Sequence, residues 1–296
     1  MDRVKQAVHY WCADTKNGSC MGQDVTVAIL DSGLAPHPDF QGRVAAFQDF
    51  VEGRREAYDD NGHGTHVAGI LAGDGRMSRG VFAGMAPKAK LVVLKVLDHK
   101  GEGNMRQILE GICWLMKHAG ELGVRVVNIS VGARAGLNEE KENWLIDAVE
   151  RLWDAGITVV VSAGNYGPKE GTIAIPGNSR KVITVGALGT PREGEGCSGR
   201  GPTEACVVKP DLVAPGYRII SCSNTPTRYR RPYAIKSGTS MATPVVAGAC
   251  AMLLSKYSDI TNAEIKLKLR ESCQREETAQ GWGLLDVERL LGTWYF

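Results

Sequence analysis

No apolar run in the sequence is long enough to cross a membrane. The longest, ITVVVSAG and VVAGACAMLL, fall well short of the roughly 20 residues that a spanning helix needs, and they are typical of buried core elements. The N-terminal stretch MDRVKQAVHYWCADTKNGSC also lacks an apolar segment followed by a small-residue cleavage site, so it is not a secretory signal. We therefore expect a cytoplasmic protein without a membrane partner; a secreted chain that has already lost its signal is the alternative.

Metal-binding cysteine patterns are also absent. The chain has eight cysteines but no C-x-x-C, and no His and Cys pairs stand at zinc spacing, which argues against a zinc site. Cys12 with Cys20, and Cys197 with Cys206, are close enough in sequence for local disulfides. Free thiols agree better with a cytoplasmic protein, so they are the expectation.

Neither sign of charge is in large excess. The 35 Lys and Arg residues against 33 Asp and Glu leave a net charge of +2, which is too balanced to suggest binding of nucleic acid or an anionic membrane. The sequence shows no repeat, no low-complexity block and no linker that would divide a core. One domain is the simplest organisation for 296 residues.

Short β-branched runs alternate with segments of helical period. Nearly continuous apolar runs predict strands, and amphipathic runs between them predict helices, which together indicate βαβ units around a parallel sheet buried on both faces. The strands are expected at 25–30, 90–97, 124–130, 157–162, 182–187 and 218–222, and the helices at 63–71, 104–119, 138–154, 244–257 and 263–271. Cys113 and Cys250 fall within apolar helical patterns and are expected to be buried.

Polar residues follow several of these strands. Ligands of open α/β sheets bind beyond the carboxyl ends of the strands, where this chain has DSG at 31–33, SVG at 130–132 and AGN at 163–165. DDNGHGTHVAG at 59–69 opens the first crossover helix. These segments supply an acid, a histidine and an amide.

The stretch SGTSMATP at 237–244 offers several hydroxyls to such a group. All six histidines precede Ser240, which excludes the Ser, acid, His order of α/β-hydrolases, and Ala242 replaces the last glycine of G-x-S-x-G. A chymotrypsin-like order could use His63 and a later Asp, but that fold is built of β-barrels. The order that remains is Asp31, His63, Ser240.

VAILDSG, DDNGHGTHVAG, VVVSAGN and SGTSMATP resemble the four signature segments of the subtilisin-like serine proteases, or subtilases, in that family's order. GRGPT and KPDLVAPG resemble a further segment, and the likeness extends over about residues 25–286, closest in character to bacterial intracellular subtilases. It implies an α/β fold of three layers, with a mostly parallel central sheet flanked by helices. It also implies an endopeptidase in which Asp31 orients His63, His63 acts as general base and acid, Ser240 is the nucleophile and Asn165 donates to the oxyanion.

The same resemblance implies a substrate groove. Backbone of the substrate would add to Gly101-Glu102-Gly103 and to Ser130-Val131-Gly132, with Met105, Ile108 and Val131 in a second apolar pocket. The pocket for the residue before the scissile bond would have two walls, Ser130–Gly132 and Ala163-Gly164-Asn165, with Ala174 near its base. No charge lies at that base, so apolar residues such as Leu, Met or Phe are expected there, while Glu102 would favour basic residues nearby.

The lead-in and a possible calcium site differ from many secreted subtilases. Residues 1–24 form a lead-in expected to pack on a catalytic domain of 25–296. The thirty residues before Asp31 match the lead-in of a mature enzyme, so a prodomain either was removed before this numbering or is not needed for folding. Asp39 and Asp74 stand where relatives bind calcium, but Arg76 and Arg79 oppose a cation there, so no metal and no required cofactor are expected.

A catalytically silent subtilase that serves as a scaffold is the competing hypothesis. The intact triad and Asn165 argue against it. The related sedolisin-type peptidases would need Glu at His63 and Asp at Asn165, and neither is present.

Overall fold

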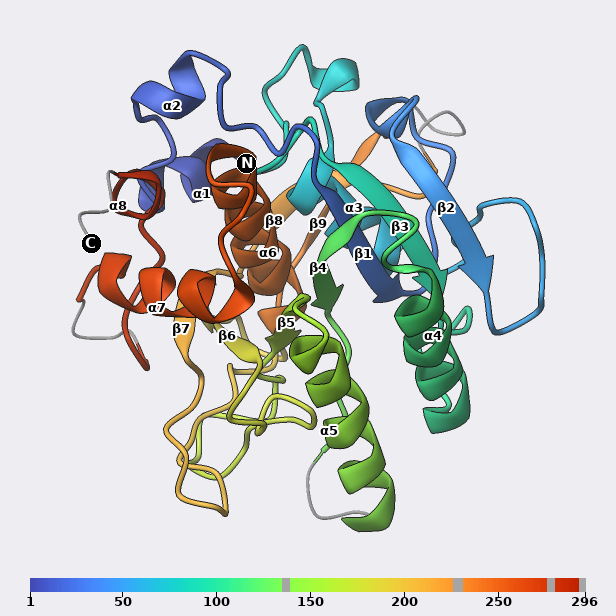
Figure 1. Ribbon diagram of the computed structural model, residues 1–296, viewed down its shortest axis with the longest axis vertical. Coiled ribbons are helices and arrows are strands. Elements are labelled where there is room, and N and C mark those ends of the chain that lie inside the picture. Colours follow the sequence, from blue (N-terminus) through green and yellow to red (C-terminus); the bar gives the residue numbers. More distant parts are fainter. Residues whose placement is uncertain (135–138, 226–230, 276–279, 293–296) are drawn as a thin grey trace.

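Parallel strands form the central sheet of the computed structural model, which describes residues 1–134, 139–225, 231–275 and 280–292 (Figure 1). Within these residues the sheet has seven strands in the order β2-β3-β1-β4-β5-β6-β7, and every neighbouring pair is parallel. The strands are β1 Thr26–Asp31, β2 Val44–Asp49, β3 Lys90–Lys95, β4 Val124–Ile129, β5 Thr158–Ser162, β6 Ile183–Leu188 and β7 Leu212–Pro215. A separate antiparallel pair consists of β8 Ile219–Cys222 and β9 Tyr233–Lys236.

Helices cover both faces of the sheet (Figure 1). They are α1 Asp2–Ala7, α2 Ala13–Lys16, α3 His63–Ala72, α4 Met105–His118, α5 Glu139–Asp154, α6 Thr239–Lys256, α7 Asn262–Ser272 and α8 Val287–Leu291, with short 3₁₀ turns at Pro38–Phe40 and Arg76–Ser78. No helix in the described part of the chain combines the length and apolarity needed to span a bilayer. The expected α/β fold with a mostly parallel central sheet is confirmed.

The alternation of side chains along β1 explains the layers. Val27 and Ile29 belong to one hydrophobic core together with α3 and α6, whereas Ala28 and Leu30 belong to a second core together with α4 and α5. Every residue of β1 is buried, and between Thr26 and the final aspartate its sequence TVAILD is entirely apolar. Asp31 therefore ends a central strand, where its carboxylate faces the edge formed by the strand ends.

The order in which successive strands are added to the sheet reverses between β1 and β4. Strands β2 and β3 lie on one side of β1, and β4 to β7 follow in order on the other. A ligand site of an open α/β sheet is expected at such a switch point, beyond the carboxyl ends of the strands. The loops after β1, β4 and β5 meet there.

The N-terminal and C-terminal segments lie side by side (Figure 1). The N–H of Val287 donates to the carbonyl of Val8 at 2.8 Å, and Lys256 Nζ lies 2.9 Å from Asp14 Oδ2. Val4 and Val8 belong to the core formed with α6. The residues before β1 are thus packed on the face that α6 covers.

Some expectations about local structure were wrong. α6 begins at Thr239, not at 244, so Ser240 lies in its first turn. Cys113 is exposed on the outer side of α4, because only one stripe of this amphipathic helix faces the sheet, while Cys250 in the buried α6 is inaccessible. All eight cysteines are free thiols.

Candidate active site

Asp31 and His63 form the centre of the site. His63 opens α3, and its Nδ1 lies 2.7 Å from Asp31 Oδ1, while the carboxylate is fully buried and the imidazole is one quarter exposed. The carboxylate can only accept, so Nδ1 carries the proton and donates it. This leaves Nε2 of His63 with a free lone pair, which is the state that a general base requires.

The environment of His63 favours its protonated form. Burial opposes protonation, but the negative charge of Asp31 and the hydrogen bond to it outweigh this and raise the pKa of His63 above its usual value. The positive charge of Lys236 acts in the opposite sense. An imidazolium formed on His63 is therefore stabilised by the carboxylate behind it.

Asp59 fixes the turn that leads into α3. Its Oδ1 accepts from Ser32 Oγ at 2.9 Å and from the N–H groups of Asn61 and Gly62 at 3.1 and 2.7 Å. Its Oδ2 accepts from the N–H and the hydroxyl of Thr65 at 2.8 and 2.6 Å. Burial alone would raise the pKa of Asp59, but these donors lower it, so a carboxylate ties β1 to the first turn of α3.

Ser240 and Ser130 form a reciprocal pair. The hydroxyl of Ser240 donates to the Ser130 carbonyl at 2.8 Å, and the hydroxyl of Ser130 donates to the Ser240 carbonyl at 3.1 Å. Pro244 explains why that carbonyl is available: proline has no N–H to donate to the residue four positions earlier in the helix. Within the described residues no hydrogen bond joins Ser240 to His63, so the Ser240 hydroxyl must stop donating to the Ser130 carbonyl before it can donate to Nε2.

Asn165 follows β5 and is held in one orientation by Thr239. Its Oδ1 accepts from the N–H of Thr239 at 3.0 Å and from the Thr239 hydroxyl at 3.2 Å. The amide Nδ2 therefore points away from Thr239. Asn165 is exposed, and among the described residues the N–H of Ser240, in the first turn of α6, has no acceptor, a combination suited to an oxyanion.

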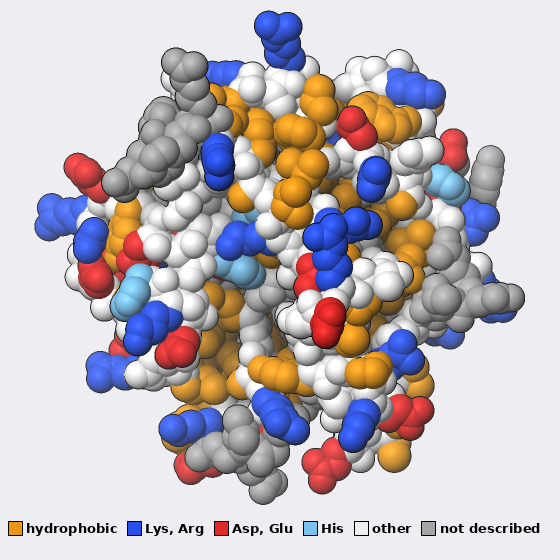
Figure 2. Space-filling view, turned by 180° about the vertical axis from the view of Figure 1, so that it is seen from behind, with side chains coloured by type: hydrophobic (Ala, Val, Ile, Leu, Met, Phe, Trp, Pro, Cys, Tyr) orange, Lys and Arg blue, Asp and Glu red, His pale blue; other side chains and the backbone are white. Residues whose placement is uncertain are grey.

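A groove of about 790 Å³ runs past these residues. Figure 2 shows that this protein has a face hollowed near its centre, with hydrophobic and histidine side chains bordering the depression. Seven predicted substrate residues line the groove together with His63, Asn165 and Ser240: Gly101, Glu102, Gly103, Ser130, Val131, Gly132 and Gly164. Met105 and Ile108 also line it, as expected of the second apolar pocket.

Ala163 and Ala174 do not line the groove; both are fully buried behind its wall. A Cβ on Gly132 would come within 3.0 Å of the Ala174 Cβ, and one on Gly164 within 2.5 Å, so Ala174 supports the wall from inside. Residues that sequence reasoning missed include Leu145, Tyr166 and Pro176. Tyr166 and Pro176 lie beside segments that the sequence singled out, whereas Leu145, on α5, carried no signal.

The surroundings of Asp39 do not suit calcium. Its carboxylate already accepts from the N–H of Met77 at 3.0 Å and from the hydroxyl of Tyr233 at 2.8 Å. The Arg43 guanidinium donates to the carbonyl oxygens of Asp39, Ala72 and Ala89, so a positive charge already occupies this group of oxygens. A hard cation needs six or more free oxygen ligands.

His37, Asp39 and Cys222 lie within ligand distance of one another and are all buried. The Nε2 of His37 lies 2.8 Å from the Pro232 carbonyl, and its Nδ1 accepts from the Asp39 N–H at 3.1 Å. Burial raises the pKa of Cys222 well above its usual range, and the thiol donates to Asp39. The cluster is a hydrogen-bonded core element with no free ligand set.

Comparisons with known proteins agree with this geometry. Residues 22–283 match the model of the subtilase family. The chain is 41% identical over 281 residues to "Serine protease AprX" of Bacillus subtilis (strain 168), covering 88% of this chain and 64% of that protein. It is 35% identical over 274 residues to "Subtilisin DY" of Bacillus licheniformis, covering 90% of each.

Solved structures show the same arrangement. "Sphericase" superposes with a TM-score of 0.77 at 29% identity, covering 90% of this chain and 92% of the other. "Crystal structure of a cold adapted subtilisin-like serine proteinase" gives 0.72 at 28% identity, covering 90% of each chain. With the acid, the imidazole, the serine and the amide placed as described, the chain belongs to the subtilase family.

Proposed function

We propose that this protein is a serine endopeptidase that hydrolyses peptide bonds of polypeptide substrates. The observation that carries the proposal is the His63 imidazole, whose Nδ1–H is held by buried Asp31 at 2.7 Å and whose Nε2 is free. The relative named AprX is a serine protease, of which this chain spans 64%. The family and the site together support the same chemistry here.

In the proposed reaction, Ser240 Oγ leaves the Ser130 carbonyl and attacks the scissile carbonyl carbon, while its proton passes to His63 Nε2. The oxyanion that forms accepts from Asn165 Nδ2 and from the Ser240 N–H. The imidazolium then protonates the amine as the C–N bond breaks, which leaves an acyl ester on Oγ. Water, deprotonated by His63, attacks this ester and releases the acid, and the proton returns to Oγ.

The groove supports a preference for apolar residues before the scissile bond. Val131, Gly132 and Gly164 form its wall, and Ala174 lies behind them without any charged side chain at that position. Lys100 and Glu102 lie in the lining and would act on residues further from the bond. A panel of peptide substrates tests this: faster cleavage after Arg or Lys than after Leu or Phe would contradict it.

We further propose that residues 25–296 act as one catalytic domain on which 1–24 pack, that no metal is required, and that the protein is cytoplasmic. The Arg43 guanidinium beside Asp39 supports the absence of a required metal. The eight free thiols support a cytoplasmic protein. A melting temperature that rises sharply with calcium, or the protein found only outside cells after fractionation, would contradict them.

Labelling with a fluorophosphonate tests the chemistry directly, because the probe reacts with an activated serine. We expect wild type to be labelled and to cleave peptides, and Ser240→Ala to do neither while keeping the same melting temperature. A folded wild-type protein that is labelled no better than Ser240→Ala would instead support a silent scaffold.

A further inference from the structure

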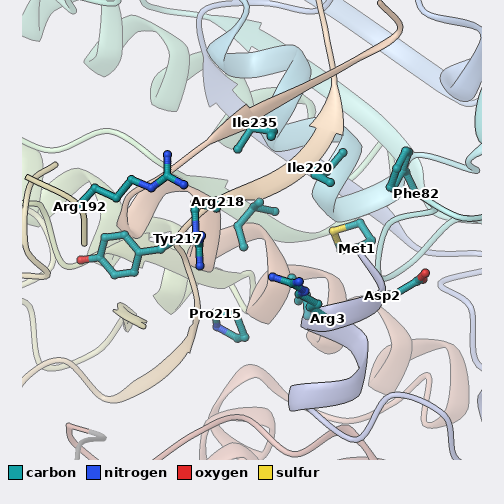
Figure 3. A pocket seen from close by; sticks show the side chains of 12 residues that line it. Met1, Asp2, Arg3, Phe82, Arg192, Pro215, Tyr217, Arg218, Ile220 and Ile235 are labelled. Carbon is teal, nitrogen blue, oxygen red and sulfur yellow. The ribbon is translucent and has the colours of Figure 1, made fainter. Parts of the chain in front are cut away.

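A second hollow, of about 620 Å³, lies apart from the substrate groove and shares no lining residue with it (Figure 3). Elements distant in sequence enclose it: α1, the segment around Arg192, and the β8–β9 pair. Its volume lies within the range of about 300–1,000 Å³ that is typical of small-molecule sites. The size therefore suits a small ligand.

The floor of this hollow is apolar. Ile220 and Ile235 are directly opposite each other across β8 and β9, and both line it. Phe82 lines it as well and is fixed by edge contact with the ring of Tyr233, at 4.8 Å between centroids. Ile235 is 65% exposed, an unusual state for an isoleucine on a strand, and a ligand lying on this floor would bury it.

The walls carry more positive than negative charge. Arg3, Arg192 and Arg218 all line the hollow, and Asp2 is the only acidic residue that does. Figure 3 shows that these arginines are arranged around it, with Arg3 and Arg218 on opposite sides. Within the described residues no carboxylate lies within 4.0 Å of any of the three guanidinium groups.

Two details near Arg218 bear on a site for an anion. Glu195 interacts with the charges of Arg192 and Arg218, but its carboxylate is held by the Ser237 hydroxyl and the Arg192 N–H. The backbone of Arg218 has a φ of +56°, which is costly for a residue with a side chain. Such strain is found at ligand clamps, where it holds a side chain in position.

We propose that this hollow binds a small amphiphilic carboxylate, with its head between the guanidinium groups and its aliphatic body on Ile220 and Ile235. Arginine binds carboxylates through two parallel hydrogen bonds, and the apolar floor adds affinity that a bare anion would lack. The proposal does not depend on the peptidase reaction. Its test can therefore use the full chain with Ser240→Ala, which also prevents self-digestion.

Isothermal titration of that variant with decanoate, below its micellar concentration, is the first test. We expect saturable binding of one decanoate per chain, and much weaker binding of decanol and of acetate. Arg192→Gln and Arg218→Gln should each weaken decanoate binding roughly tenfold or more, since each removes a charge-assisted contact. Arg200→Gln, which changes an exposed arginine outside the hollow, should have no effect.

Arg218→Gly separates a binding role from a structural one. Glycine relieves the positive φ, so the melting temperature should stay the same or rise while decanoate binding is lost. Absence of saturable decanoate binding, equal binding of decanol, or wild-type affinity in Arg218→Gln would each overturn the proposal. So would binding of an acidic apolar peptide without binding of decanoate.

Discussion

Replacement of Asp59 by Asn should destabilise the protein strongly, although only one atom changes. The amide keeps one oxygen, so three of the five hydrogen bonds survive without the negative charge, each weaker by about 1 kcal/mol. The new Nδ2 faces the buried N–H of Thr65, which loses its acceptor at a cost of about 1–3 kcal/mol. We expect a total loss of about 4–6 kcal/mol, a large part of the roughly 5–15 kcal/mol by which proteins are stable.

Urea unfolding at neutral pH, measured by tryptophan fluorescence with Ser240→Ala as the parent, gives this free energy. Asp154→Asn is the control, because it removes an exposed ion pair with Lys181 and should change little. The folded-state pKa of Asp59 is lowered, so its contribution is present above the unfolded value of about 3.9 and is lost as the pH falls through the folded value. The difference between Asp59→Asn and its parent should therefore shrink in acid. A loss below about 1 kcal/mol at neutral pH would refute the hydrogen-bond argument.

Three further predictions concern catalysis. Lys236→Met removes a positive charge that lowers the pKa of His63, so the acid limb of the profile of kcat/KM against pH should move to higher pH. An acid limb that does not move would contradict this. Asn165→Leu should lower kcat by about 10²–10³-fold with little change in KM, the range known from a subtilisin's own oxyanion donor; a fall in affinity alone would show that the amide only binds substrate. Gly164→Val should reduce cleavage of apolar substrates at least about tenfold, because its Cβ would lie 2.5 Å from the Ala174 Cβ, while Gly194→Val, at a similar φ but in open space, should keep full activity.

The sequence was sufficient to predict the buried parallel strands, because their runs are apolar on both faces. It did not reveal β2, whose pattern is mostly exposed or half-buried, since an edge strand needs no continuous apolar run. The short strands β7 and β9 and the helices α1, α2 and α8 were also missed. Each is at most six residues long, and packing, not local periodicity, determines such elements.

The triad and Asn165 could be named from motif order, but their contacts could not. Thr239 orients Asn165, and Ser130 holds the hydroxyl of Ser240. Both contacts depend on the loops after β4 and β5 being brought against the first turn of α6. Ala163 and Ala174 illustrate a second limit of prediction from the sequence. The likeness to the family pointed to this wall, but only the packing shows that the glycines line the groove and the alanines lie behind them.

The position of Ser240 on α6 has a consequence for how the molecule loses its structure. This helix is buried along most of its length between the sheet and α3, so its amide hydrogens can exchange with solvent only when the core opens. The β8–β9 pair that leads into it is a two-stranded ribbon and can open at lower cost. On heating, the ribbon should therefore detach first, while Ser240 keeps its place until the whole fold unfolds.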